Sequence, residues 1–233
     1  MAVKPPASGP ARLNVATETV ATRKRRSAKI AAGLATTYPD AWCALVHRDA
    51  WELLVATILS AQCTDKLVNT VTPGLFAAYP TPAALATASP ADVERLIGQC
   101  SFFRQKAKAI ITTAGLIVSG HGGTVPADME ALTALPGVGR KTANVVLGTV
   151  FGQPAIFVDT HVNRLSNRLG LTVEDDPVKI ERDLQALLPP VAWTHFAHRL
   201  IHHGRLCCVA RKPRCTACAV ASSCPRIGVT TSA

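Results

Sequence analysis

Apolar positions recur at helical spacing along most of the chain, and they predict a protein built of helices. Residues 51–59 are almost continuously apolar and follow Asp49, a side chain suited to cap a helix start, so we expect a buried helix there. Thr81 and Ser89 are each followed by a proline, the pattern of a capping hydroxyl before a first helical residue. Further helices are predicted over residues 107–118, 128–135, 139–150, 160–169, 177–188 and 193–206. With little strand signal and no fixed repeat, the pattern indicates an all-α fold.

The composition fits a folded protein with an aliphatic core. Apolar residues make up 48% of the 233 residues and charged residues 17%, which excludes disorder for most of the chain. No stretch approaches the roughly 20 uncharged apolar residues of a membrane span, and the first residues lack the apolar run of a signal peptide. We therefore expect a soluble, cytoplasmic protein that does not interact with membranes.

Positive charge is concentrated at the two ends of the sequence. Residues 1–30 hold seven Lys or Arg against one acid, and residues 184–233 hold six against none, while the whole chain carries a formal charge of +10. If the two ends meet in space, one face of the molecule is strongly positive, as expected for a protein that binds nucleic acid. Basic termini can also serve solubility alone. Residues 1–27, with three prolines and the run Arg-Lys-Arg-Arg, are expected to form a flexible basic arm.

The eight cysteines fall into two groups. Three are isolated in apolar surroundings and are interpreted as small buried hydrophobes: Cys43, Cys63 and Cys100. The other five lie between residues 207 and 224, and in a chain without an export signal such crowding favours a metal site over disulfides. Four of them have gaps of six, two and five residues: Cys208, Cys215, Cys218 and Cys224. This spacing alone allows either zinc or an iron–sulfur cluster.

A glycine-rich turn is the most specific local feature. The run Leu-Pro-Gly-Val-Gly-Arg-Lys-Thr-Ala occupies residues 135–143, where the proline ends one helix and Gly137 and Gly139 are expected to adopt backbone angles closed to other residues. Exposed N–H groups at the start of the next helix would then bind a phosphate without reading bases, helped by Arg140. A tight helical hairpin could also use this pattern for steric reasons only.

This run resembles the helix-hairpin-helix of the endonuclease III family of DNA base-excision glycosylases. The resemblance implies that Lys141 is the catalytic nucleophile. The positive end of the helix dipole, Arg140 and partial burial would all favour its neutral amine. The run Val-Asp-Thr-His at residues 158–161 is similar to a second family motif, and it implies that Asp159 stabilises the cationic sugar or helps to activate Lys141. Asp159 is also a good helix cap, and His161 is interpreted as structural.

Three further expectations depend on the same resemblance. The four cysteines have the family's [4Fe-4S] spacing, with Cys207 as a neighbour or, after a shift of register, a replacement for Cys208. The loop between the first two cysteines would present three cations to phosphates: Arg211, Lys212 and Arg214. Gln62 would fill the space left by an extruded nucleotide, and Phe102 would wedge into the opposite strand. Both side chains could instead serve as core or cap residues.

The resemblance covers roughly residues 30–226, and it implies two helical domains. These are a six-helix domain over residues 43–153, with the hairpin, and a discontinuous cluster domain formed by residues 28–42 and 154–233. The implied protein is a monomeric, bacterial-type enzyme associated with the nucleoid. It removes oxidised pyrimidines from double-stranded DNA, acts at abasic sites and cleaves the strand by β-elimination through a lysine Schiff base. The alternatives are an adenine glycosylase and a non-catalytic iron–sulfur protein that binds DNA.

Overall fold

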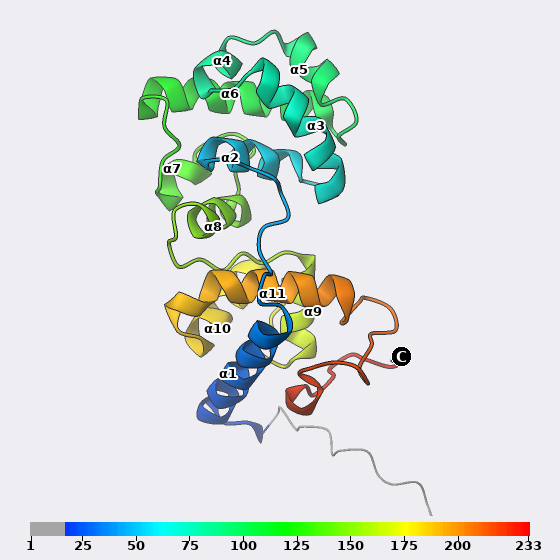
Figure 1. Ribbon diagram of the computed structural model, residues 1–233. Coiled ribbons are helices and arrows are strands. Elements are labelled where there is room, and N and C mark those ends of the chain that lie inside the picture. The colour runs from blue at the N-terminus through cyan, green and yellow to red at the C-terminus, as the bar shows by residue number, and fades with distance from the viewer. Residues whose placement is uncertain (1–16) are drawn as a thin grey trace, which may run out of the picture. The chain divides into compact units, whose positions relative to one another are not determined.

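The computed structural model describes residues 17–233, and every regular element in that part of the chain is helical (Figure 1). The all-α prediction is thereby confirmed. The chain divides into two compact units: unit 2 is Cys43–Phe157, and unit 1 combines the described residues before it with Val158–Ala233. Unit 2 ends at Phe157 rather than at residue 153, because the buried residues 155–157 are tied to it by Asn144, whose side-chain amide donates to the carbonyl of Ile156 at 2.9 Å.

Unit 2 is built around one buried helix, α2 (Ala50–Leu59). Every residue from Trp51 to Leu59 is buried, and α2 contacts α3, α6 and α8. The unit contains seven helices rather than the six that the resemblance implied. They are α2, α3 (Asp65–Ala78), α4 (Pro82–Ala86), α5 (Pro90–Leu96), α6 (Phe103–His121), α7 (Met129–Thr133) and α8 (Arg140–Thr149). Two of them, α4 and α7, have only five residues each.

Side chains predicted as caps begin several of these helices. Asp49 accepts a hydrogen bond from the N–H of Glu52, and Thr81 and Asp128 cap α4 and α7 in the same way. Ser89 is the exception, since its hydroxyl makes no capping bond although Pro90 begins α5 as predicted. Local sequence therefore fixes where most helices of unit 2 begin.

Unit 1 packs four helices against one another. They are α1 (Val20–Thr37), α9 (Thr160–Arg168), α10 (Pro177–Leu187) and α11 (Trp193–Leu206). Both α1 and α9 contact α10 and α11. Beyond α11, residues 207–233 contain only a short 3-10 turn at Ala221–Ser223. No described helix has both the length and the apolar character required to cross a membrane.

The expectation of a flexible arm over residues 1–27 is wrong for residues 20–27, which are helical. Helix α1 begins at Val20, capped by Thr19, so the basic run lies inside a helix. Arg26 is buried and its guanidinium donates to both carboxylate oxygens of Glu18 at 2.8 Å and to the carbonyl of Gly170 at 2.8 Å. Burial of this cation against a distant part of unit 1 gives the segment a fixed structure. Residues 1–16 lie outside the described part of the chain.

Candidate active site and cysteine cluster

The glycine-rich turn joins α7 to α8 and is anchored in the core of unit 2. Gly137 has a φ of 78°, which favours glycine, and a Cβ there would lie 3.3 Å from side-chain atoms of both Ile58 and Ala109. The Thr113 hydroxyl of α6 donates to the carbonyl of Pro136 at 3.0 Å. The turn is therefore held against the end of α2 and the middle of α6, and its backbone is presented on a rigid support.

Gly139 has a different role from the one expected. Its φ of −90° is open to any residue, so the expectation of a special backbone angle is wrong at this position. A Cβ at Gly139 would meet no atom within 4 Å, and as the N-cap of α8 it offers no capping side chain. A helix N-terminus that is accessible and has no side-chain cap can bind a phosphate, because its free N–H groups and the helix dipole attract negative charge.

Lys141 lies in the first turn of α8 with an exposed side chain, next to the exposed Arg140. The partial burial expected for Lys141 is therefore wrong. Within unit 2, Lys141 makes no hydrogen bond or ion pair, so its amine is not held away from a substrate. The site therefore combines an exposed primary amine with a helix N-terminus that has no side-chain cap.

Gln62 and Phe102 share an unusual backbone geometry. Both are exposed and both have a φ of 55°, the left-handed region that side chains other than glycine rarely occupy. Gln62 lies in the turn between α2 and α3, and Phe102 is the residue before α6, with 58% of its surface exposed. Strained positions of this kind persist where the surrounding structure fixes them, and they often mark functional sites.

A buried lysine links these two turns. Lys106 of α6 is 6% exposed, and its ammonium donates to the carbonyls of Leu59 at 2.8 Å and Ala61 at 2.6 Å and to the sulfur of Cys63 at 3.3 Å. The cation therefore satisfies carbonyls at the C-terminal end of α2, where the helix dipole favours positive charge. Sequence analysis missed Lys106, since a lysine in an amphipathic helix gives no signal of burial.

Asp159 is the N-cap of α9 in unit 1, as its position after an apolar run predicted. Its Oδ1 accepts from the N–H of Val162 at 2.8 Å. His161, one residue into the helix, lies 3.2 Å from the guanidinium of Arg164, which also donates to the carbonyl of Gly204 at 3.0 Å. A Cβ at Gly204 would come within 2.8 Å of His161 Nδ1. His161 thus packs between α9 and α11, and its burial lowers its pKa.

All five C-terminal cysteines line one cavity in unit 1, and none forms a disulfide. Arg168 of α9 also lines it, and its guanidinium lies 3.5 Å from the sulfur of Cys208 and donates to the carbonyl of Val209 at 2.7 Å. Backbone N–H groups of Val220 and Arg226 face the sulfurs of Cys218 and Cys224. Several thiols around one space, with N–H donors aimed at sulfur, fit the thiolates of an iron–sulfur cluster.

Cys207 differs from Cys208 in its surroundings. Its sulfur approaches His203 and Cys218, with the three potential ligand atoms within 4.8 Å of one another, and its thiol lies 3.5 Å from the carbonyl of Arg214. Burial raises the pKa of Cys207 to about 12, so this thiol is the protonated donor of that contact. The sulfur of Cys208 instead lies 3.5 Å from the guanidinium of Arg168, so a cation rather than a carbonyl faces it.

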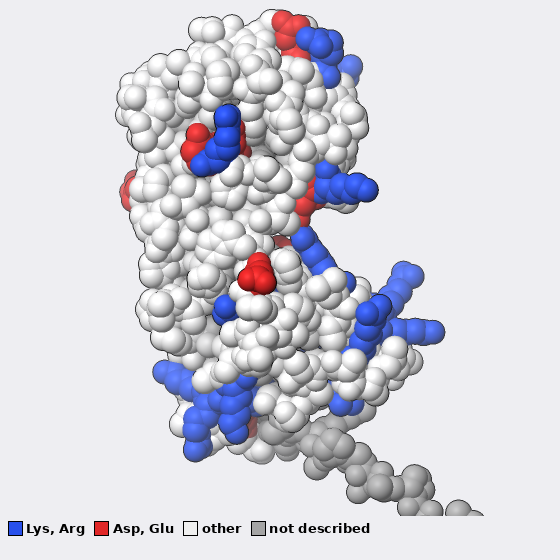
Figure 2. Space-filling model, in the orientation of Figure 1, with Lys and Arg blue, Asp and Glu red and all other residues white. Residues whose placement is uncertain are grey.

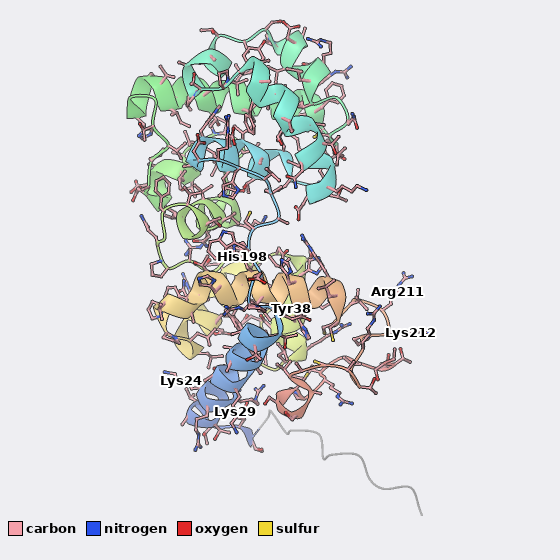
Figure 3. All side chains as sticks on the ribbon, viewed as in Figure 1. Lys24, Lys29, Tyr38, His198, Arg211 and Lys212 are labelled. Carbon is pink, nitrogen blue, oxygen red and sulfur yellow. The ribbon has the colours of Figure 1, made fainter. Side chains whose placement is uncertain are left out.

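The three expected phosphate contacts of unit 1 lie on the loop after α11. Arg211, Lys212 and Arg214 are exposed, and the buried Pro213 between them holds the loop in place. Figure 3 shows Arg211 and Lys212 extending from the opposite side of this unit to Lys24 and Lys29 of α1, and Figure 2 shows corresponding separate groups of basic side chains. The described parts of the two basic ends thus belong to one unit, and the labelled cations extend from different sides of it rather than forming one patch.

Comparison with known proteins identifies the chain's relatives. Residues 55–190 match the model of the HhH-GPD superfamily of base excision DNA repair proteins. Endonuclease III of Synechocystis sp. is 51% identical over 207 residues, which cover 88% of this chain and 94% of that protein. Endonuclease III of Bacillus subtilis is 45% identical over 188 residues, covering 80% of this chain and 86% of its own length.

Solved structures lead to the same group. A non-covalent endonuclease III–DNA complex and a trapped endonuclease III–DNA covalent intermediate each superpose with a TM-score of 0.83 at 42% identity. Each covers 86% of this chain, and the match spans 94% and 95% of the respective solved chains. Together with the family match and the helical hairpin, these likenesses establish that the chain belongs to the HhH-GPD superfamily of base excision DNA repair proteins and, within it, to the endonuclease III family.

Proposed function

We propose that this protein removes oxidised pyrimidines from duplex DNA and cleaves the strand at the resulting abasic site, with Lys141 as the nucleophile. Membership of the endonuclease III family makes it a DNA glycosylase and AP lyase of base excision repair. The choice of oxidised pyrimidines and the roles of individual residues are the parts proposed here. Since one chain carries all the motifs, we assign the activity to a monomer acting on chromosomal DNA.

The exposed amine of Lys141 is the observation that carries the proposal. It follows directly after a turn whose open helix end suits a phosphate, and no partner within unit 2 holds it. A backbone phosphate bound at this end would bring the adjoining sugar to the first turn of α8, where the amine projects. Proximity of this kind supplies much of the rate of a covalent reaction.

The chemistry proceeds through a covalent intermediate. The neutral amine of Lys141 attacks C1′ of the flipped nucleotide and displaces the base, which leaves as its protonated form. Ring opening gives a Schiff base between Lys141 and the sugar. The iminium withdraws electrons and acidifies the C2′ hydrogen, so β-elimination breaks the C3′–O bond and leaves an unsaturated aldehyde end. The trapped covalent intermediate of a relative 42% identical to this chain supports a covalent route.

Asp159 is assigned to the charge that develops on the sugar. Its Oδ1 is used in capping α9, and we assign Oδ2 to the positive charge at C1′ and to the proton released by the attacking amine. The cap fixes the carboxylate in one orientation, so capping and catalysis use the two oxygens of the same group.

The remaining candidates are assigned to holding and opening the duplex. Gly137, Gly139 and Arg140 would contact the strand that carries the lesion, and the cations of the loop 211–214 would contact phosphates. Gln62 would enter the space left by the flipped nucleotide, and Phe102 would insert beside its partner base. Their left-handed backbones and the rigid anchor at Lys106 support these roles, because an inserted side chain must resist displacement.

We assign the cysteine cavity to a [4Fe-4S] cluster held by four thiolates: Cys208, Cys215, Cys218 and Cys224. The donor set fits, since the cavity gathers these sulfurs and supplies Arg168 and backbone N–H groups to them. The cluster would supply a structural cross-link that holds the loop 211–214 in position for phosphates. Cys207 is assigned to a neighbouring thiol, consistent with its contact with a carbonyl.

Trapping of the Schiff base tests this proposal. The protein is mixed with a duplex carrying an oxidised pyrimidine and with sodium borohydride, and the covalent adduct is measured on a denaturing gel. The wild type should form the adduct and cut the strand, whereas Lys141→Gln should lose both by at least about 1,000-fold and still bind the duplex. Lys108→Gln, at another exposed lysine of unit 2, is the matched control. An undiminished adduct in Lys141→Gln contradicts the assignment.

Asp159→Asn and a panel of duplexes test the finer parts of the proposal. The amide can still accept the capping bond of α9 but cannot balance a positive charge, so single-turnover base release should fall by about 10²-fold or more with little loss of stability. The panel contains duplexes with an oxidised pyrimidine, with adenine opposite oxidised guanine and with an abasic site. Duplexes with an oxidised pyrimidine or an abasic site should be cut faster than the duplex with adenine opposite oxidised guanine. Preferential release of adenine contradicts the proposed specificity.

A further inference from the structure

Cys63 does not lie in the apolar setting that the sequence suggested. Its sulfur accepts hydrogen bonds from the N–H of Ser101 at 3.3 Å and from the ammonium of Lys106 at 3.3 Å, and it remains partly exposed. Burial alone would raise the pKa of Cys63, but the bonds from Ser101 and Lys106 outweigh it and the pKa is lowered. Two N–H donors, one of them cationic, are what stabilises a thiolate.

A second thiol faces this sulfur from a distant part of the chain. Cys100 is 2% exposed and directly precedes Ser101, whose N–H lies 3.3 Å from the sulfur of Cys63, so the chain brings the two thiols together. Burial, together with the neighbouring Cys63, raises the pKa of Cys100 to about 11. The two thiols therefore differ: Cys63 is partly exposed and its sulfur accepts from two N–H donors, whereas Cys100 is buried. This is the pairing found where one cysteine reacts first and a second resolves the product.

We propose that Cys63 and Cys100 form an oxidant-responsive dithiol that closes to a disulfide when the protein meets hydrogen peroxide. The thiolate of Cys63 attacks one oxygen of the peroxide, the O–O bond breaks, and Cys63 becomes a sulfenic acid as hydroxide leaves. The thiol of Cys100 then attacks the sulfenic sulfur, the S–S bond forms, and water leaves with the proton from Cys100. In total the two sulfurs lose two electrons, which reduce one peroxide to one water and one hydroxide, and the hydroxide takes a proton from the solvent.

The position of the dithiol gives the disulfide a consequence for DNA. Cys63 directly follows Gln62, and Cys100 lies two residues before Phe102. The new bond would join the two turns that carry these side chains, and it would change the sulfur that accepts the hydrogen bond from Lys106. Because Gln62 directly follows the carbonyl that Lys106 holds at Ala61, a shift of this contact should change the geometry of the turn. This consequence rests on the roles proposed above for Gln62 and Phe102, whereas the disulfide itself does not.

Peptide mapping of the full-length, cluster-loaded protein tests the disulfide. After brief exposure to hydrogen peroxide, catalase and alkylation of free thiols, trypsin should release Asp49–Lys66 linked to Leu96–Arg104, which contain one cysteine each. Cys43 lies in Ile30–Arg48 and should stay fully alkylated, so it serves as the internal control. In Cys100→Ala the intermediate cannot be resolved, and dimedone should label Cys63. If Cys63 is oxidised no faster than Cys43 and no linked peptide appears, the proposal is overturned.

Cleavage assays on the same samples test the consequence. In the wild type, the single-turnover rate of cutting a lesion duplex should fall at least about tenfold on oxidation and should return after treatment with dithiothreitol. In Cys63→Ala, peroxide should leave this rate unchanged. A disulfide that forms without any loss of cutting overturns the link to the DNA-binding turns. Failure of the reduced wild type to cut the lesion duplex, with the disulfide forming normally, refutes the proposed function instead and leaves the dithiol standing.

Discussion

The two units of this protein are stabilised by different interactions. In unit 2 the central helix α2 is buried along residues 51–59, and its neighbours add mainly aliphatic side chains to the core. In unit 1 arginine side chains connect distant backbone segments: Arg26 reaches the carbonyls of residues 169 and 170, and Arg168 reaches those of residues 209 and 210. Unit 2 is therefore held mainly by hydrophobic burial, with Lys106 as a buried cationic link between α6 and the end of α2, whereas unit 1 relies on several arginine cross-links.

The reason for the difference lies in the C-terminal segment. Residues 207–233 have almost no regular structure, so many of their backbone carbonyls lack partners within a helix or sheet. Buried carbonyls without donors are costly, and guanidinium groups, with five N–H donors each, satisfy several at once. Arg164 and Arg168 of α9 do this for the start of the segment, and the cysteines gather its remainder. Unit 2 thus supports the turns proposed to contact DNA from a mainly hydrophobic core, whereas the basic loop of unit 1 depends on cross-links.

Loss of the proposed cluster should give the largest effect and should separate the two units most clearly. In Cys215→Ser, or after oxidative removal of the proposed iron, residues 211–233 should lose most of their protection from amide hydrogen exchange, because the arginines of α9 hold mainly the start of the C-terminal segment. Peptides from α2 and α6 should keep their protection. Exchange measured by mass spectrometry checks both. Equal loss of protection in α2 would show that unit 2 is not self-sufficient.

Removal of a buried arginine should give the next largest effect. Arg26→Met leaves Glu18 and several carbonyls without their donor and should cost about 3–5 kcal/mol of unfolding free energy, measured by urea denaturation. Arg25→Met, at the neighbouring exposed position, should change it by no more than about 0.5 kcal/mol.

At acidic pH, Arg26 should contribute less to the unfolding free energy. Its hydrogen bond lowers the pKa of Glu18, so the stabilisation is complete above the unfolded value of 4.5 and is lost as the pH falls through the lower folded value. The difference in unfolding free energy between the wild type and Arg26→Met should therefore become smaller below pH 4.5. If this difference is the same at pH 7 and at pH 3.5, the ion pair between Arg26 and Glu18 is not what causes it.

A cavity in α2 should cost slightly less and should respond differently to solution conditions. Leu54 is fully buried in α2, and Leu54→Ala should lower the unfolding free energy of unit 2 by about 3 kcal/mol through lost burial and the cavity left behind. Because no charge is involved, the loss should be the same at pH 7 and pH 4, in contrast with Arg26→Met. Leu116→Ala, at an exposed position of α6, serves as the control and should be nearly neutral.

The sequence predicted helices of both units where the signals are local. Apolar periodicity and capping residues are such signals, so α8 of unit 2 and α9, α10 and α11 of unit 1 were expected within one residue of their observed bounds. Helix α3 was missed because Pro73 interrupts its pattern, and the start of α1 was missed because four consecutive cations suggest a solvated arm. Burial of Arg26 depends on carbonyls some 140 residues away, which no local pattern reveals.

In the candidate site, too, features with local sequence signals could be predicted and features that depend on tertiary contacts could not. Lys141, Asp159 and the cysteines could be named from motifs, and the structure adds the exposure of Lys141 and the cap formed by Asp159. The left-handed backbones of Gln62 and Phe102 could not be predicted, because no local sequence pattern marks them. The hydrogen bond from Lys106 could not be predicted either, and it gives the sulfur of Cys63 a cationic donor in place of the expected apolar setting.

The smallest effect is expected where the core of unit 2 supports the hairpin turn. Thr113→Val removes the hydroxyl that donates to the carbonyl of Pro136 while keeping the shape of the side chain, and should lower the unfolding free energy by about 1 kcal/mol. Because the bond holds the turn rather than the core, affinity for undamaged duplex should fall about two- to fivefold, measured by fluorescence anisotropy at fixed salt. Thr112→Val, at the exposed neighbouring position, should change neither quantity. Unchanged affinity in Thr113→Val would show that the turn keeps its geometry through Gly137 packing alone, and that a hydrophobic core suffices to present it.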